Sequence, residues 1–184
     1  MRNEPVPPPW NAFLREVDQR LREPVDLHCV GGFVVSLRYG LARPTGDIDV
    51  IAALPDHAKA GLVRLAGRGS DLHRKHGVYL QIVSVAATPD DYEQRLSEMF
   101  AGAFSRVRLF ALDPYDLALT KLERNLDQDV EDIRHLARVV PFDLEVLKRR
   151  YEDELRPYLG RPDREDLTLR LWIEIIEEDR GKSA

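Results

Sequence analysis

The fold is decided by two stretches of sequence, Cys29-Val30-Gly31-Gly32 and Arg43-Pro44-Thr45-Gly46-Asp47-Ile48-Asp49-Val50. Carboxylates two residues apart on a strand project from the same face, so Asp47 and Asp49 could share one hard cation such as Mg²⁺. Between a strand and a helix, Gly31 and Gly32 would let a phosphate approach backbone N–H groups. Each motif alone also fits an ordinary interpretation, as a tight turn or as a solvated strand end. Their combination at this spacing favours a site.

Hydrophobic periodicity around these stretches predicts a chain that is mixed α/β first and helical afterwards. We expect strands at 26–30, 48–52, 78–85 and 107–112, and helices at 11–23, 33–39, 55–66, from 88 onward, 113–126, 129–140, 143–156 and 163–178. The fold class is therefore α+β, a mixed sheet with helices followed by a C-terminal helical bundle region. We expect three parts: an N-terminal leader and helix (1–24), a core (25–112) and a helical region (113–184) packed on the core.

The length, net charge and cysteine content of the chain exclude several classes of protein. A chain of 184 residues can form one domain with a sizeable core and a small helical appendage. Its 27 Lys and Arg against 32 Asp and Glu give a net charge of −5, which disfavours general nucleic-acid binding. The single cysteine, Cys29, excludes an internal disulfide. With no secretory signal and no membrane-spanning apolar run in view, we expect a cytoplasmic protein without a membrane partner.

The glycine pair and the Asp-x-Asp motif resemble the signature of the nucleotidyltransferase superfamily with the polymerase-beta-type palm. More narrowly, Gly-Gly, a short helix and Arg-x-Thr-x-Asp-x-Asp are similar to minimal bacterial nucleotidyltransferases related to the AbiEii abortive-infection toxins. The resemblance covers residues 25–137 and implies a palm-like sheet, an NTP substrate, Mg²⁺ with Mn²⁺ as the alternative ion, and an RNA (tRNA) or protein acceptor. It also implies a bacterial toxin–antitoxin or abortive-infection setting with a cognate partner protein. Asp47 and Asp49 would hold the metal, and Gly31 and Gly32 the triphosphate.

Basic residues complete the expected nucleotide site. Arg43 and Thr45 precede the acid pair closely enough to contact phosphate or ribose, although turn chemistry alone explains them equally well. In the resembling family a later helix carries a lysine and a following basic residue, matched here by Lys121 and Arg124. Lys121 would offset charge on the departing pyrophosphate. The alternatives are that Lys121 pairs with a carboxylate and that Asp129 belongs to a capping box.

Gln81 marks a departure from that family. Active relatives place a third carboxylate at the centre of a hydrophobic-Asp-hydrophobic triplet, and the triplet here is Leu80-Gln81-Ile82. A glutamine carries no charge, so activation of the attacking hydroxyl is expected to be weakened while binding of NTP·Mg²⁺ survives. The rival hypothesis is a nucleotide-binding or protein-interaction module that has lost catalysis.

A local basic segment interrupts the acidic chain. Residues 61–77 carry four Lys and Arg against one Asp, and this segment is the best candidate for contact with RNA or an acidic partner. Within it, we interpret 67–77 as a polar loop. His73 and His76 could bind zinc together only on a helix, and the flanking glycines argue against one.

Overall fold

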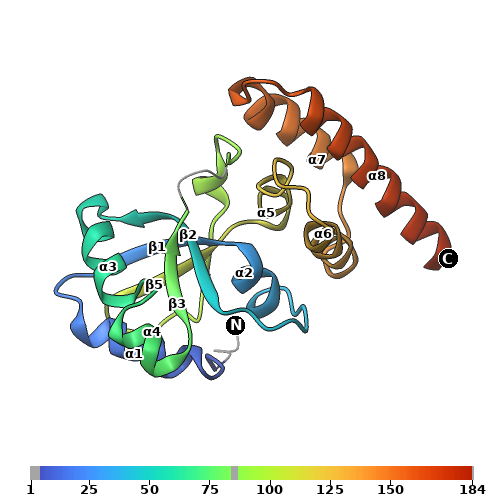
Figure 1. Ribbon diagram of the computed structural model, residues 1–184. Helices are drawn as coiled ribbons and strands as arrows, with labels where there is room; N and C mark the ends of the chain where they lie inside the picture. Colours follow the sequence, from blue (N-terminus) through green and yellow to red (C-terminus); the bar gives the residue numbers. More distant parts are fainter. Residues whose placement is uncertain (1–4, 84–86, 184) are drawn as a thin grey trace. The chain divides into compact units, whose positions relative to one another are not determined.

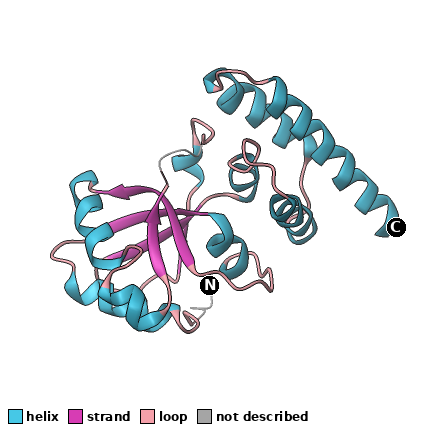
Figure 2. Ribbon diagram, in the orientation of Figure 1, coloured by secondary structure: helices cyan, strands magenta, loops and turns pink. Residues whose placement is uncertain are grey.

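The computed structural model describes residues 5–83 and 87–183, and these form two compact units. One unit lies within 1–84 and 96–112, and the other within 85–95 and 113–184. The strands described all belong to the first unit, whereas the second is helical (Figures 1 and 2). The predicted α+β class with a mixed sheet and C-terminal helices is therefore confirmed. Packing of the helical region on the core stays a prediction.

The sheet has the strand order β3-β2-β1-β5-β4. The strands are β1 (Val25–Val30), β2 (Asp47–Leu54), β3 (Tyr79–Ile82), β4 (Ser97–Met99) and β5 (Val107–Ala111). β1 is antiparallel to β2 and parallel to β5, β2 is parallel to β3, and β4 is antiparallel to β5. Strand β2 thus lies between β1, which leads into the glycine pair, and β3, which carries Gln81. The short strand β4 has too few residues to show a period, and the sequence did not predict it.

Helices of the first unit bury their apolar faces against this sheet. They are α1 (Trp10–Arg20), α2 (Gly31–Leu37), α3 (Lys59–Ala66) and α4 (Asp71–His76); the 3₁₀ turn η1 (Asp56–Ala58), which precedes α3, has no buried residue. Phe13 and Leu14 of α1 are fully buried, and so are Ile48 and Val50 of β2. Trp10 packs edge-to-face on Phe33 of α2, with ring centroids 4.9 Å apart. Burial of the alternate positions 48 and 50 leaves the two aspartates of β2 on the opposite face.

Residues 71–76, predicted as loop, form helix α4. Ser70 caps its first turn by accepting a hydrogen bond from the backbone N–H of His73, and Gly77 ends it with φ of 72°. The glycines thus bound a helix instead of preventing one. Both histidines have protein partners: His76 Nε2 lies 3.0 Å from Glu16 Oε1, and His73 Nδ1 accepts from the backbone N–H of Gly69. These contacts leave the pair unsuited to share a zinc ion.

The helical unit departs from the predicted boundaries at several places, including its last helix, which was predicted to end at residue 178 and ends at Ser183. It contains η2 (Tyr92–Arg95), α5 (Pro114–Leu119), α6 (Asp127–Val139), α7 (Leu144–Arg150), the π-helical turn η3 (Tyr151–Leu155), η4 (Arg156–Tyr158) and α8 (Asp163–Ser183). The helix predicted to reach residue 126 ends at Leu119, and turns follow it. The helix predicted from residue 88 is a single 3₁₀ turn, and the helix predicted over 143–156 changes to η3 after Arg150. The end of the predicted strand at 84–85 lies outside the described residues.

A buried ion network joins η2 to the rest of its unit. Arg95 Nε donates to Asp116 Oδ2 at 2.8 Å, and its NH2 group donates to Glu154 Oε2 at 2.6 Å. Arg150 donates to the other oxygen of Asp116 at 3.0 Å. Because the Asp116 side chain is fully buried, both arginines are needed to compensate its charge. The network ties Arg95 and its turn to the helical unit although a strand of the sheet follows them.

Asp18 connects α1 to the loop before β5 and should make the fold sensitive to acid. Burial opposes ionisation of its carboxylate, but hydrogen bonds from the backbone N–H groups of residues 105–107 outweigh burial and lower the pKa of Asp18. Because the pKa of Asp18 is lower in the folded state than its unfolded value of about 3.9, the ionised carboxylate stabilises the fold at pH values above that value. This stabilisation is lost as the pH falls through the folded-state pKa. We expect Asp18→Asn to lower the unfolding free energy by about 2 kcal/mol at pH 7, and by less at pH 3, in urea titrations. An equal loss at both pH values would contradict this assignment.

Candidate active site

Asp47 and Asp49 lie on one face of β2, at its start. The residues between and after them, Ile48 and Val50, are fully buried, whereas both aspartates are partly exposed. Alternation along a strand therefore presents two carboxylates side by side to solvent. Two oxygen-donor side chains at this spacing suit a hard cation that completes its shell with substrate oxygens and water. Among the described residues no cluster of three or more His, Cys, Asp or Glu is placed to hold a metal ion.

The glycine pair approaches Asp49 closely because β1 and β2 are neighbours. Val30, the last residue of β1, is paired with Asp49, so Gly31 follows directly beside that carboxylate. Gly31 has φ of +70°, and a Cβ added to it would overlap Asp49 Oδ2. Both the backbone conformation and the contact therefore require glycine at position 31. Gly31 and Gly32, predicted as a tight turn before a helix at 33–39, are instead the first two residues of α2, which ends at Leu37.

Arg43 and Thr45 lie over Gly32. A Cβ built on Gly32 would be 3.5 Å from Thr45 Oγ1 and 3.7 Å from the NH2 atom of Arg43. Ser36 Oγ of α2 donates to the carbonyl of Arg43 at 2.9 Å and so ties this loop to the helix. Thr45 Oγ1 lies 3.3 Å from the carbonyl oxygen of Asp47. The structure thus gathers a guanidinium, a hydroxyl, two glycines and two carboxylates at one end of β2.

Gln81 lies on the strand beside Asp49. In the parallel pairing of β2 with β3, Asp49 is in register with Gln81, and Asp47 with Tyr79. Residues in register on neighbouring strands share a face and are separated by about 4.8 Å along the hydrogen-bonding direction. Gln81 is exposed, whereas its neighbour Leu80 is buried. An exposed amide therefore stands where a third acid would meet the aspartate pair.

Tyr79 is a site residue that sequence reasoning did not single out. Its hydroxyl donates a 3.0 Å hydrogen bond to Asp47 Oδ2. Burial, together with this hydrogen bond and the negative charge of Asp47, raises the pKa of Tyr79, so the phenol keeps its proton at neutral pH. The i, i+2 spacing in the sequence indicates that Tyr79 lies on the same face of its strand as Gln81. Only the register of β2 with β3 shows that Tyr79 lies beside Asp47.

Lys121 and Arg124 belong to the helical unit, in the turn that follows α5. Lys121 Nζ is buried and donates to Asp132 Oδ2 at 2.7 Å and to Asp129 Oδ1 at 3.3 Å. Arg124 Nε donates to Asp129 Oδ2 at 2.9 Å. Asp129 also accepts from the backbone N–H of Leu126, which is the N-cap of α6, so Asp129 is the third helical residue and not the cap residue itself, as its alternative role had it. A contact of Lys121 or Arg124 with phosphate stays a prediction.

Replacement of Lys121 can show whether this residue stabilises the fold by pairing with buried carboxylates or contributes to nucleotide transfer. Lys121→Met keeps the length of the side chain and leaves the fully buried Asp132 without its cation. We expect the unfolding free energy in urea to fall by about 3–5 kcal/mol, the usual result of breaking a buried pair on one side. Lys148→Met, which removes an exposed pair with Glu145, should leave stability unchanged. Unchanged stability of Lys121→Met with lost transfer would instead assign Lys121 to the phosphate.

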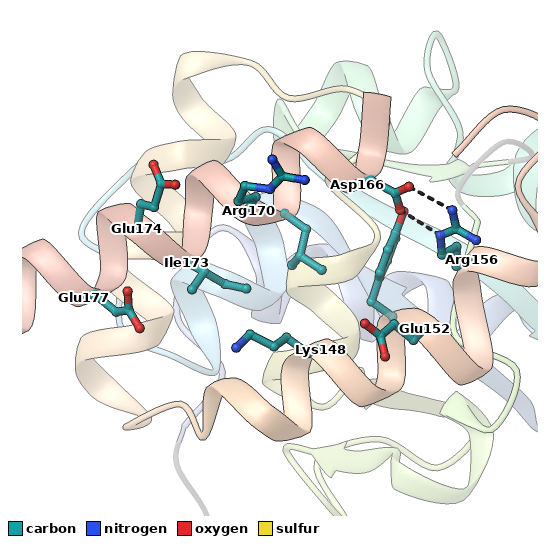
Figure 3. Close-up of a pocket in the computed structure, with 10 residues that line it drawn as sticks. Lys148, Glu152, Arg156, Asp166, Arg170, Ile173, Glu174 and Glu177 are labelled. Carbon is teal, nitrogen blue, oxygen red and sulfur yellow. Dashed lines mark hydrogen bonds and ion pairs between the residues drawn. The ribbon is translucent and has the colours of Figure 1, made fainter. Parts of the chain in front are cut away.

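The helical unit also contains a cavity of about 500 Å³ between α8 and the segment α7–η3–η4 (Figure 3). Its apolar floor is formed by Tyr151, Leu169 and Ile173. Four acids line it, Glu152, Asp166, Glu174 and Glu177, against three cations, Lys148, Arg156 and Arg170. Arg156 and Asp166 pair with each other at 2.8 Å. Because Lys148 also pairs with Glu145 and the lining acids outnumber the cations, this cavity is a poor match for a triphosphate, and the aspartate pair of β2 remains the candidate site.

Comparison with known proteins agrees with this geometry. Residues 12–180 match the family DUF6036, described as a nucleotidyltransferase of unknown function. The chain belongs to this family. No curated protein and no solved structure matched the chain. The match spans the sheet with its aspartate pair and the helices that follow, so the nucleotidyltransferase assignment extends to both units. No described helix is long and apolar enough to cross a membrane.

Proposed function

We propose that this DUF6036 protein is a Mg²⁺-dependent nucleotidyltransferase that transfers a nucleoside monophosphate from an NTP to a hydroxyl group of RNA, such as tRNA, or of a protein. The observation that carries the proposal is the close approach of Gly31 to Asp49, which shares one face of β2 with Asp47. This arrangement supports a binding site in which the phosphates of the NTP accept hydrogen bonds from backbone N–H groups, next to the two carboxylates. Mn²⁺ is the alternative ion. The bacterial toxin–antitoxin or abortive-infection setting, with an AbiEii-like partner system, is part of the same proposal and rests on the resemblance of motifs.

The donor set of the site fits the metal that this chemistry requires. Asp47 and Asp49 would hold the ion through carboxylate oxygens, and the remaining positions would be taken by phosphate oxygens and water. When bound, Mg²⁺ neutralises charge that develops on the triphosphate during displacement. Arg43 and Thr45 would bind phosphate or ribose by charge-assisted and hydroxyl hydrogen bonds.

In the reaction, the acceptor hydroxyl oxygen forms a bond to the α-phosphorus. The bond from that phosphorus to the bridging oxygen of the β-phosphate breaks, and pyrophosphate leaves on the opposite side. The hydroxyl proton passes to solvent or to a base. Lys121 and Arg124 are proposed to offset pyrophosphate charge, which would require Lys121 to exchange its contacts with Asp132 and Asp129, and Arg124 its contact with Asp129.

A second function is favoured by Gln81. The amide stands in register with Asp49 where active relatives are expected to carry the third acid. A chain with this replacement could bind NTP·Mg²⁺ and act as a nucleotide-binding or protein-interaction module with weak or no transfer.

The two functions are separated by product formation. The native protein is incubated with Mg²⁺ and each α-labelled NTP in turn, together with total bacterial RNA and cell protein, and Asp49→Asn serves as the comparison. Label on RNA or protein that requires Asp49 supports the transferase. Saturable NTP·Mg²⁺ binding that requires Asp49, without labelled product, supports the module.

A further inference from the structure

Both oxygens of Asp47 have a neighbouring hydroxyl group. Tyr79 Oη donates to Oδ2 at 3.0 Å, and Thr45 Oγ1 lies 3.5 Å from Oδ1. The phenol is the stronger contact because of its shorter distance. These two contacts restrict rotation of the Asp47 carboxylate about its Cβ–Cγ bond. They therefore fix its orientation on the face of β2 that also carries Asp49.

The ring of Tyr79 is itself held from outside the strands. His73 of α4 packs edge-to-face on it, with centroids 4.9 Å apart and planes at 64°. The Arg68 guanidinium carbon lies 5.8 Å from the ring centroid on the loop before α4. Two contacts from 67–77, the segment that the sequence analysis interpreted as a polar loop, therefore restrict the position of the phenol and, through it, of Asp47.

We propose that Tyr79 is a positioning residue for Asp47, fixing the orientation of that carboxylate toward a bound divalent cation. The proposal rests on the proposed function only in taking Asp47 as a metal ligand. A phenol suits the task because it donates a hydrogen bond without adding positive charge, so the negative charge of Asp47 stays available to a cation. An arginine or lysine at position 79 would orient the carboxylate but compete with the metal for it.

The test measures metal binding directly, with Mn²⁺ alone as the probe. Binding is followed by the electron paramagnetic resonance signal of free Mn²⁺ for the native protein, Tyr79→Phe and Asp47→Asn. We expect Tyr79→Phe to raise the dissociation constant for Mn²⁺ about 10-fold, the lower end of the usual effect of removing a partner that orients a metal ligand. In transfer assays the Mg²⁺ concentration for half-maximal rate should rise similarly, while the rate at saturating Mg²⁺ stays within a few-fold of native.

Tyr39→Phe is the matched control. Tyr39 lies in the same unit, and its hydroxyl donates to the backbone carbonyl of Leu112 at 3.1 Å and not to an aspartate of β2. It should leave Mn²⁺ affinity unchanged. Arg68→Gln, which removes the cation over the ring while keeping the hydroxyl, should weaken Mn²⁺ binding less than Tyr79→Phe does, and it provides a readout should Tyr79→Phe fail to fold.

Each outcome decides the proposal. Native Mn²⁺ affinity in a folded Tyr79→Phe overturns it, and so does equal weakening by Tyr39→Phe, which would indicate a general loss of structure. Absence of Mn²⁺ binding to the native protein, or binding insensitive to Asp47→Asn, also overturns it. If no nucleotide is transferred but Tyr79→Phe weakens Mn²⁺ binding as expected, the positioning role stands and the proposed transferase function fails.

Discussion

Asp49→Asn is expected to lower the rate of Mg²⁺-dependent nucleotide transfer by about 10³-fold, which corresponds to about 4 kcal/mol of transition-state stabilisation. Asparagine has nearly the same shape, so the close approach of Gly31 to residue 49 is preserved. What is lost is one negative charge in the pair that would hold the ion. The expected result is measured as initial rates with saturating NTP and excess acceptor, and Asp47→Asn should behave alike.

The matched control for this prediction is Asp26→Asn. Asp26 is a strand carboxylate of the same unit whose partner is Arg108, at 2.6 Å. Its replacement removes a surface ion pair and should leave the transfer rate unchanged. The thermal midpoint of Asp49→Asn should not fall, because two neighbouring like charges repel in the absence of a cation. If Asp49→Asn retained its transfer activity, the aspartates of β2 would not be catalytic. The active site expected from the family membership would then have no candidate residues in this sheet.

Much of the first unit could be predicted because its signals are local. The strand before Gly31, the helix after it and the alternation around Ile48 each depend on a few consecutive residues, and the structure has all three. The identification of Gln81 with the third-acid position came from resemblance, and its register with Asp49 is consistent with it. Which strand lies beside which is set by long-range packing that no local pattern contains.

The missed features have two different causes. Helix α4 was missed although its signals were present, since Ser70 is a good N-cap and Gly77 a good C-terminal residue for a helix. Pairing of Lys121 with a carboxylate was one of the predicted alternatives, but Asp132 could not be named as the partner, because the contact depends on the chain turning after Leu119 and bringing α6 back toward α5. The hydrogen bond from Tyr79 to Asp47 likewise joins residues 32 positions apart. Side-chain networks of this kind follow from tertiary structure alone.

Gln81→Asp is the variant expected to gain activity. An aspartate at position 81 would place a carboxylate in register with Asp49, on an exposed position that can accept the charge without burial. Three acids would then meet at the end of β2, and the new one could take the proton of the attacking hydroxyl or help to hold the ion beside it. General-base catalysis contributes about 10²- to 10⁴-fold, so we expect the transfer rate to rise by about 100-fold at equal NTP and Mg²⁺ concentrations.

Gln81→Asn is the control, since it has the shape of aspartate with the neutral amide of the native residue. If Gln81→Asp gains activity and Gln81→Asn does not, the charge at position 81 limits the reaction, and the native chain is a slow or disabled transferase. If the native protein is already fast and neither variant changes the rate, another group takes the proton and position 81 is not part of the chemistry. A loss of activity in Gln81→Asp would mean that the native amide itself contacts the nucleotide or the acceptor. The gain expected here follows from the strand register, so either of the last two results would contradict the equivalence of Gln81 with a third metal-site acid.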